Sequence, residues 1–94
     1  MVERGSAHEE ARRRFGTVLR RVRKAKRLKL SALADRAGYS ERHVGDVERG
    51  AKSPTLGFIC SVAEALGVLP STLLSSLVDD LAKDGYTFDP NREE

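Results

Sequence analysis

The sequence has little of several residue types, and each shortage narrows what the chain can be. It has no Trp, two Tyr and three Phe, so a core must be built mainly from aliphatic side chains. Its single cysteine, Cys60, excludes an internal disulfide and a cysteine-rich metal site, and it suits the reducing cytoplasm. No apolar run approaches membrane-spanning length, and the N-terminus MVERGSAHEE lacks the apolar core of a signal peptide. We therefore predict neither a bound metal nor a membrane association.

Acidic residues are absent from one long stretch of the chain. Residues 12–29 hold ten Lys or Arg and no Asp or Glu. Residues 12–52 carry fourteen basic and four acidic side chains, a balance of +10, whereas residues 79–94 carry six acidic and two basic, a balance of −4. A basic body with an acidic end indicates a surface that binds a polyanion. The alternative is an ordinary solvated helix surface, and charge alone does not separate the two.

What the chain does contain is a helical pattern of apolar residues. Ninety-four residues make one small domain, and the apolar positions recur at spacings of three and four, without the alternation typical of strands. The pattern predicts five helices and no sheet, over about residues 9–26, 30–37, 41–49, 56–66 and 70–83. We expect an all-α domain over residues 9–84, a disordered N-terminus over 1–8 and a flexible acidic tail over 85–94.

Capping residues mark several of these boundaries. Three of the segments are followed directly by a glycine, at Gly38, Gly50 and Gly67. Ser40 and Thr55 precede the third and fourth segments, and each is expected to cap its helix through the side-chain oxygen. The second segment follows Lys29 instead, which has no oxygen to offer and weakens that helix by about 1 kcal/mol.

Residues 28–50 predict two short helices joined by a tight turn. Small or apolar residues stand where such a pair would touch, at Leu33, Ala34, Ala37, Val44 and Val47. Two helices that cross closely near a right angle need small residues at the contact and a glycine in the turn, and the chain has both. Together these features predict a compact helical hairpin behind a basic first helix.

Residues 15–74 resemble the phage-repressor-like (Xre/Cro) helix-turn-helix family. The matching positions are Leu19-Arg20, Arg23, Leu28, Leu33-Ala34, Ala37-Gly38-Tyr39-Ser40, Val44-Gly45, Val47-Glu48, Gly50, Pro54-Thr55-Leu56 and Val62-Ala63-Glu64-Ala65-Leu66-Gly67-Val68. The resemblance covers about two thirds of the chain. It implies a compact five-helix, repressor-like DNA-binding domain with the helix-turn-helix at the second and third helices.

The resemblance also implies that the third helix enters the major groove of DNA, where its early residues meet base edges. At the matching positions the base-reading candidates are Glu41, Arg42, His43 and Asp46. Arg42 suits the two acceptors of guanine, and an acidic side chain suits the amino group of cytosine. The alternatives are as follows for each residue. Glu41 simply suits the first turn of a helix, and Asp46 pairs with Arg42 or Arg49. His43 contacts a phosphate instead of a base, or has no role.

Phosphate contacts are implied for the rim of the same surface. The candidates are Arg27, Lys29, Ser40, Arg49, Lys52 and Ser53. Such contacts fix position without reading sequence. Where relatives often have Gln, this chain has Leu30, which we expect to meet a thymine methyl or to pack on its own helix. Gly45 costs its helix about 1 kcal/mol, and close approach to DNA or to the second helix would explain it.

Two expectations concern the packing of the domain. The resemblance implies a partly buried ion pair between Arg23 and Glu48, which would tie the first helix to the end of the third. Cys60 is expected on the core face of the fourth helix, near Ile59.

The fifth helix is the expected dimer interface. One reading helix covers only about four base pairs, so selective binding favours a homodimer on a palindromic site. Its candidate interface residues are Leu73, Leu74, Leu77, Val78 and Leu81. We expect the stripe of Leu73, Leu77 and Leu81, or that of Leu74 and Val78, to close the core and the other to meet a second copy. The alternative is that both stripes serve the core and the protein dimerises only on DNA.

These observations predict a sequence-specific regulator of transcription that binds double-stranded DNA, either a repressor or an autoregulatory switch. We expect a cytoplasmic, nucleoid-associated protein of bacterial or phage origin. Its small size leaves no separate ligand-sensing domain, so no cofactor or small-molecule ligand is expected. Phe15, Gly16, Leu19, Arg20 and Arg23 resemble the corresponding residues of restriction–modification controller proteins.

Other classes of function fit the sequence less well. An antitoxin-type protein would bind and neutralise a partner protein while regulating its own operon, but only residues 85–94 offer a spare segment for the partner. An enzyme is not expected, because the chain has no nucleophile–base pair, metal-ligand spacing or phosphate-binding glycine loop. RNA binding is disfavoured because the interleaved surface aromatics that stack bases are missing.

Overall fold

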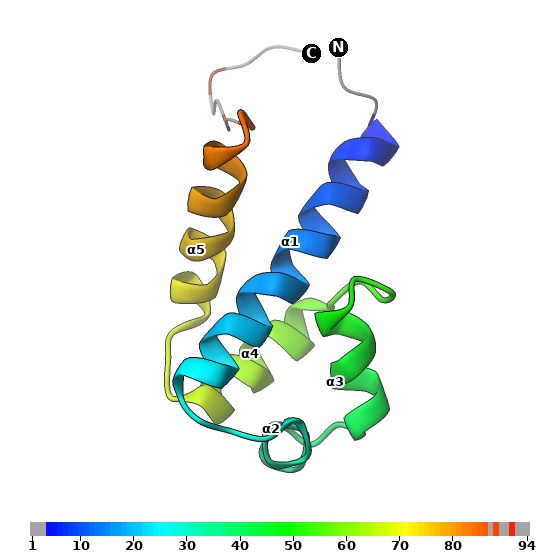
Figure 1. Cartoon of the computed structure of the whole chain (residues 1–94), viewed down its shortest axis with the longest axis vertical. Coiled ribbons are helices and arrows are strands. Elements are labelled where there is room, and N and C mark those ends of the chain that lie inside the picture. Colours follow the sequence, from blue (N-terminus) through cyan, green and yellow to red (C-terminus); the bar gives the residue numbers. More distant parts are fainter. Residues whose placement is uncertain (1–3, 87, 89–90, 92–94) are drawn as a thin grey trace.

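The protein is described by a computed structural model, which covers residues 4–86, 88 and 91. Its five helices are α1 (Arg4–Ala25), α2 (Leu30–Ala37), α3 (Glu41–Glu48), α4 (Leu56–Leu66) and α5 (Pro70–Lys83). The covered residues contain no strand. The predicted all-α fold of five helices is confirmed, and Figure 1 shows their arrangement.

The first helix differs from its predicted extent. It begins at Arg4, five residues before the predicted start, so residues 4–8 are helical where disorder was expected. The sequence before Arg4 has no Ser, Thr, Asp or Asn to signal this start, and no apolar pattern precedes Ala11, which is why the sequence did not predict it. Residues 1–3 and most of the predicted tail lie outside the described part of the chain. The division into a domain and two flexible ends therefore stays a prediction.

The helix caps follow the sequence signals. The Ser40 side chain accepts a hydrogen bond from the backbone N–H of His43 at 3.0 Å, and Thr55 accepts one from Phe58 at 3.0 Å. Lys29 precedes α2 without a side-chain cap, as expected. Gly38, Gly50 and Gly67 all have the left-handed backbone, with φ of 79°, 77° and 72°. Local residue chemistry thus marks the starts of α3 and α4 and the ends of α2, α3 and α4.

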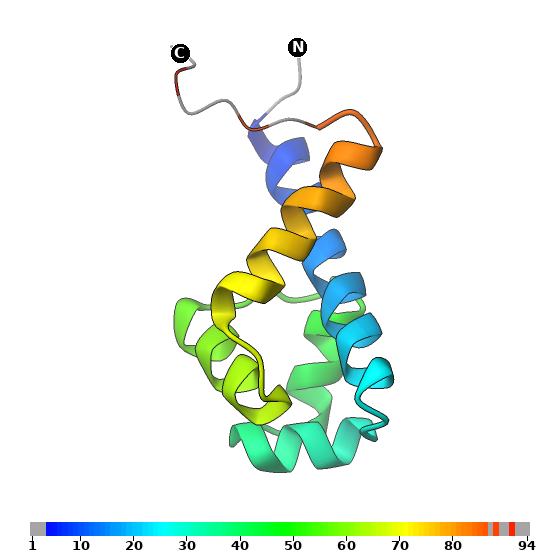
Figure 2. The ribbon, with the colours of Figure 1, turned by 90° about the vertical axis from the view of Figure 1, so that its left-hand side faces the viewer.

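The core lies where all five helices meet. α1 packs against both α3 and α5, while α2 packs against α3 and α4. In Figures 1 and 2, α1 and α5 extend together beyond the other three helices, which gather at the opposite end of the molecule. The buried cluster is formed by Phe15, Val18, Leu19, Leu33, Ala34, Val44, Val47, Phe58, Ile59, Val62, Ala63, Leu66 and Leu73. It is mainly aliphatic, as the composition predicted.

α1 and α3 approach each other at a glycine. A Cβ atom on Gly16 would stand 2.3 Å from the carbonyl oxygen of Val47 and 2.6 Å from that of Glu48. One turn earlier on α1, Arg13 lies close to Gly50, where a Cβ would stand 2.9 Å from the Arg13 Cγ. Since the neighbours of Gly16 are backbone atoms, only glycine allows the two helices to lie this close.

Charged side chains join α1 to α5. The Arg21 guanidinium donates to Asp80, with Nη2–Oδ1 at 3.0 Å and Nη1–Oδ2 at 3.4 Å, and Arg14 pairs with Asp84. Asp80 is only 8% exposed. The hydrogen bond from Arg21 lowers the pKa of the Asp80 carboxyl below its ordinary value of 3.8, although burial opposes this. The acidic end of α5 therefore holds part of the basic surface of α1.

The predicted position of Cys60 is wrong. Its side chain is exposed rather than part of the core. The buried residues of α4 are Phe58, Ile59, Val62, Ala63 and Leu66. Cys60 follows Ile59 by about 100° around the helix, which turns its side chain off this face.

The two apolar stripes of α5 have different surroundings. Leu73 and Leu81 are buried at 0% and 2% exposure, and Leu77 is half-buried against the core. Leu74 and Val78 are 41% and 42% exposed. Leu73, Leu77 and Leu81 are therefore packed inside the subunit, which corrects their inclusion among the interface residues. Only Leu74 and Val78 remain as candidates.

Among the described residues, no single helix is long and apolar enough to cross a membrane. Taken together, α4 and α5 are long and apolar enough by length and composition alone, but they are bent by 105° relative to each other.

Candidate nucleic-acid interface

The helical hairpin of α2 and α3 buries residues at which the sequence predicted contact. Leu33 and Ala34 of α2 are buried together with Val44 and Val47 of α3. Gly38 ends α2 in the left-handed conformation, where its backbone N–H bonds back into the helix. Because the inner side of α3 is occupied by this contact, its outer side faces solvent. Glu41 and Arg42 at the start of α3 are both exposed.

The outer face of α3 carries a network of one carboxylate and two guanidinium groups. Asp46 Oδ1 lies 2.6 Å from Arg49 Nη2, and Asp46 Oδ2 lies 4.0 Å from Arg42 Nε. The Arg42 side chain is 91% exposed, so it remains free to reach a ligand. Asp46 is only 25% exposed and is already bound to Arg49. The structural alternative for Asp46, a pair with an arginine, is the arrangement observed.

His43 belongs to an aromatic cluster. Its ring stacks on Phe58 of α4, with ring centres 5.3 Å apart and planes inclined by 17°. Tyr39 packs on both rings, at 4.8 Å from His43 and 4.9 Å from Phe58. His43 is half-buried, unlike Glu41 and Arg42 on the same helix. The cluster fixes the start of α3 on α4 and holds the imidazole in one orientation.

The candidates for phosphate binding lie in loops and at helix ends beside α3. Arg27 and Lys29 lie between α1 and α2, whereas Lys52 and Ser53 lie between α3 and α4. All four are exposed, and no acidic residue in the described part of the chain pairs with the three cations. The remaining two candidates are already engaged, Ser40 as the cap of α3 and Arg49 with Asp46.

Leu30 packs between helices instead of on its own helix. A Cβ on Gly45 would stand 3.4 Å from Leu30 Cδ2, which places this side chain of α2 against α3. Leu30 is half-buried and belongs to the margin of the core. α2 and α3 are therefore in contact at Gly45, where close approach to the second helix is one of the two explanations that its position suggested.

Arg23 and Glu48 form a two-pronged ion pair. Arg23 Nε and Nη2 donate to the two carboxylate oxygens of Glu48 at 2.7 and 3.0 Å, and Arg23 Nη1 donates to the carbonyl of Leu28 at 2.8 Å. Their side chains are 10% and 5% exposed. Hydrogen bonding to Glu48 raises the pKa of the Arg23 guanidinium. The pair ties α1, the loop after it and the end of α3 together.

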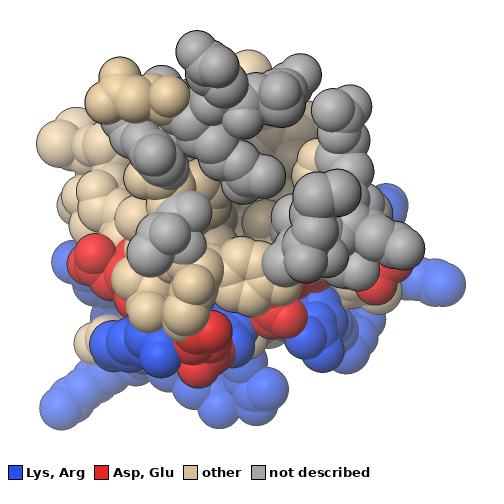
Figure 3. Space-filling view, turned by 90° about the horizontal axis from the view of Figure 1, so that it is seen from above, with Lys and Arg blue, Asp and Glu red and all other residues tan. Residues whose placement is uncertain are grey.

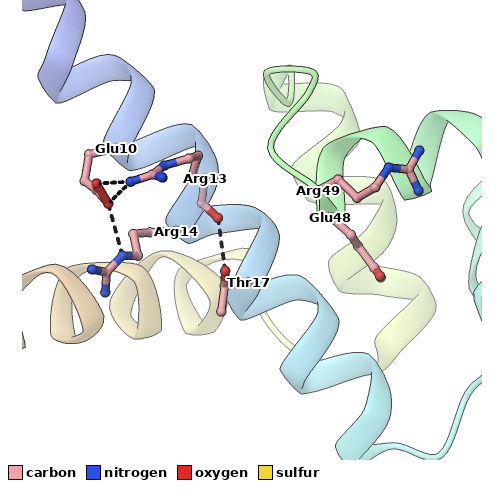
Figure 4. Close-up of a pocket in the computed structure, with 6 residues that line it drawn as sticks. All are labelled: Glu10, Arg13, Arg14, Thr17, Glu48 and Arg49. Atoms are coloured by element: carbon pink, nitrogen blue, oxygen red, sulfur yellow. Dashed lines mark hydrogen bonds and ion pairs between the residues drawn. The ribbon is translucent and has the colours of Figure 1, made fainter.

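A shallow polar pocket lies between α1 and the end of α3. It is lined by Glu10, Arg13, Arg14, Thr17, Glu48 and Arg49. Figure 4 shows Arg13 and Arg14 turned toward Glu10, whereas Arg49 points away from α1 along α3. Glu10 accepts from Arg13 at 2.6 Å and from Arg14 at 3.2 Å, and its pKa is lowered chiefly by the Arg13 hydrogen bond. The polar groups on the α1 wall thus satisfy one another.

Charge is unevenly spread over the surface. Seen from the end where α1 begins and α5 finishes, Lys and Arg gather along one margin of the molecule, with the acidic residues among them (Figure 3). Among the described residues, no group of three or more His, Cys, Asp or Glu could hold a metal ion.

The comparison with protein families decides the classification. The model described as "Helix-turn-helix domain" matches residues 14–77. The chain belongs to this family. It shares 34% identity over 67 residues with the HTH-type transcriptional regulator SutR of Escherichia coli. That match covers 71% of the chain but only 38% of SutR.

Two solved structures place the fold among regulators. The restriction–modification controller protein C.AhdI of Aeromonas hydrophila is 39% identical, with a TM-score of 0.64 over 65% of this chain and 92% of that one. The clp gene regulator ClgR of Corynebacterium glutamicum is 28% identical, with a TM-score of 0.76 over 79% of each chain. This helix-turn-helix chain is not an enzyme, in agreement with the prediction.

Sequence reasoning missed three residues that position the interface. Gly16 was considered only as part of a motif, although a glycine inside an amphipathic helix is itself a sign of close packing. Phe58 supports the imidazole of His43, and Asp80 anchors α1 through Arg21. Neither contact has a local signal, since the partners are on different helices.

Proposed function

We propose that the protein is a sequence-specific, double-stranded DNA-binding regulator of transcription, acting from the cytoplasm. The observation that carries this proposal is the outer face of α3, where Arg42 is almost fully exposed, together with the exposed cations Arg27, Lys29 and Lys52 in the loops before α2 and after α3, none of which pairs with an acidic side chain of the described residues. Such a helix can enter a major groove while cations beside it meet the phosphates. The names of SutR, C.AhdI and ClgR, all regulators or controllers, support the same function.

The proposal includes a homodimer that binds a palindromic operator and acts as a repressor or autoregulatory switch. Leu74 and Val78 expose apolar surface on α5, a helix that packs mainly against α1 and α4. A symmetric pair joined there leaves both reading helices free, and two-fold protein symmetry demands a two-fold symmetric site.

Selection of bound sites from random duplex DNA tests the proposal directly. The expected result is enrichment of one palindrome whose half-sites are about one helical turn apart. Enrichment of a site without symmetry would overturn the dimer and keep the DNA-binding function. Recovery of unenriched DNA after repeated rounds would overturn the sequence-specific function.

Arg42→Ala and Lys52→Ala separate base reading from phosphate binding. Loss of the Arg42 fork should relax the preference at one position of each half-site, at a cost of about 1–3 kcal/mol on the preferred site. Loss of the Lys52 charge should weaken binding to all sequences alike. It should also reduce the slope of log affinity against log salt concentration by about one. Fluorescence anisotropy on the selected site and on random duplex, at several salt concentrations, measures both effects. Equal effects of the two variants on both duplexes would contradict the assignment.

A further inference from the structure

Arg49 reaches back over the helix that it terminates. It is the C-cap residue of α3, yet its Nη2 atom is bound to Asp46 Oδ1, three residues earlier, at 2.6 Å. Its Nη1 atom would lie 3.0 Å from a Cβ on Gly45, four residues earlier. Side chains on a helix lean toward its N-terminus, so this path is a natural one. The guanidinium therefore lies beside the middle of α3 and not at its end.

Gly45 leaves the space in which this guanidinium lies. Gly45 has a helical backbone and needs no special φ, so backbone conformation does not account for a glycine there. Leu30 closes one side of the space, and the Asp46 carboxylate holds the guanidinium on the other. An alanine Cβ would stand 3.0 Å from Arg49 Nη1, so that the guanidinium has to shift by a few tenths of an ångström, and 3.4 Å from Leu30 Cδ2, where contact is ordinary. The glycine thus accommodates the arginine as well as the approach of α2.

The charge beside Arg49 favours a base over a phosphate. Asp46 repels a phosphate group but takes only one of the two Nη2 hydrogens, so the second Nη2 hydrogen and an adjacent one on Nη1 or Nε can still donate together along one edge of the guanidinium. A held guanidinium with two free donors matches the paired acceptors N7 and O6 of guanine. The Arg49 side chain is 63% exposed, so a base edge can reach it.

We propose that Arg49 reads a guanine in the major groove and that Asp46 is the positioning residue that orients it. The inference rests on the proposed DNA-binding function and changes two assignments made from the sequence. Arg49 moves from the phosphate-binding set to the base-reading set, and Asp46 acts through Arg49 instead of touching a base itself. Gly45 provides the room that both need.

Three variants of the full chain test this inference on the duplex that the unaltered protein selects. Arg49→Lys keeps the charge and removes the fork, Asp46→Asn removes the orienting charge, and Gly45→Ala displaces the guanidinium with both charges intact. Arg20→Lys, at an exposed position on α1, is the matched control. Anisotropy is measured on the selected duplex, on every single base-pair substitution of one half-site, and on random duplex. Thermal melting of each variant shows that it is folded.

All three variants should lose discrimination at the same G·C base pair, roughly tenfold for Arg49→Lys. Binding of random duplex should be unchanged for Arg49→Lys and tighter for Asp46→Asn, which removes a negative charge. The control should keep the full preference. A uniform loss of affinity with Arg49→Lys would assign Arg49 to phosphate and overturn the inference, as would relaxation of different base pairs by Arg49→Lys and Asp46→Asn. If the unaltered protein selects no sequence, the proposed function fails together with the inference; if it selects one that Arg49→Lys still distinguishes, only the inference fails.

Discussion

At the level of single residues, Gly16 controls how closely α1 lies on α3. Gly16→Ala would bring a methyl group to 2.3 Å from the Val47 carbonyl oxygen, and backbone on both sides leaves it no room. We expect a net loss of about 1–3 kcal/mol in the free energy of unfolding, despite the better helix propensity of alanine. Urea denaturation followed by far-UV circular dichroism measures this change.

Gly57→Ala is the matched control for this substitution. The nearest atom to a Cβ on Gly57 is Thr55 Oγ1, at 3.9 Å, so alanine fits without strain. Its stability should be unchanged or slightly raised. Equal stability of the two variants would show that the contact between α1 and α3 relaxes without cost.

The buried pair of Arg23 and Glu48 predicts a second residue effect. Glu48→Ala leaves the guanidinium of Arg23, whose side chain is 10% exposed, without a carboxylate partner. The free energy of unfolding should fall by about 3–5 kcal/mol, the cost expected for a buried charge without a partner. The melting temperature should fall sharply. An apolar double variant, Arg23→Met with Glu48→Leu, should recover much of the loss, because no charge is then left unpaired.

Glu10→Ala is the control for this effect, since its main partner Arg13 is 65% exposed. It should change the melting temperature little. A melting temperature of the Glu48→Ala variant equal to that of this control would contradict the role of the buried pair in stability.

At the level of helices, the contact of α1 with α5 should depend on pH. The pKa of Asp80 is lowered in the folded protein, so its stabilising contribution is complete above the ordinary value of 3.8 and disappears as the pH falls through the lower folded value. We expect the free energy of unfolding to decrease as the pH drops below about 4. Asp80→Asn should be less stable at pH 7 and should show a weaker dependence on pH. Urea titrations from pH 7 to pH 2.5 compare the two proteins, and identical pH profiles would contradict the prediction.

The helices also show what a sequence can and cannot predict. Ser40, Thr55, Gly38 and Gly67 act on their own helices within a few residues, so their caps were predictable from spacing alone. Arg21 and Asp80 are 59 residues apart, and only the path of the folded chain brings them together. The same holds for the contact of Gly45 with Leu30 and for the stacking of His43 on Phe58. The sequence was therefore enough to propose an interface on α3, while the partners of its residues required the structure.

At the level of the whole molecule, the exposed side of α5 should determine assembly. Leu74→Glu places a charge on the proposed dimer surface, whereas Thr72→Glu places one at an exposed position roughly 160° around the same helix. The first should give a monomer with weakened operator binding, and the second should leave the dimer intact. Sedimentation equilibrium at several concentrations measures the mass of each variant. A dimer that tolerates both charges would place the contact elsewhere.

α1 contacts both α3 and α5, and it is fastened on each side. Gly16 and the Arg23–Glu48 pair fix it to the reading helix, and the Arg21–Asp80 pair fixes it to the helix proposed to meet a second subunit. Two such subunits would hold their α3 helices at a fixed separation, because no flexible linker joins α3 to the rest of the subunit. The dimer would then reject an operator whose two halves are wrongly spaced, even when every base in each half is correct.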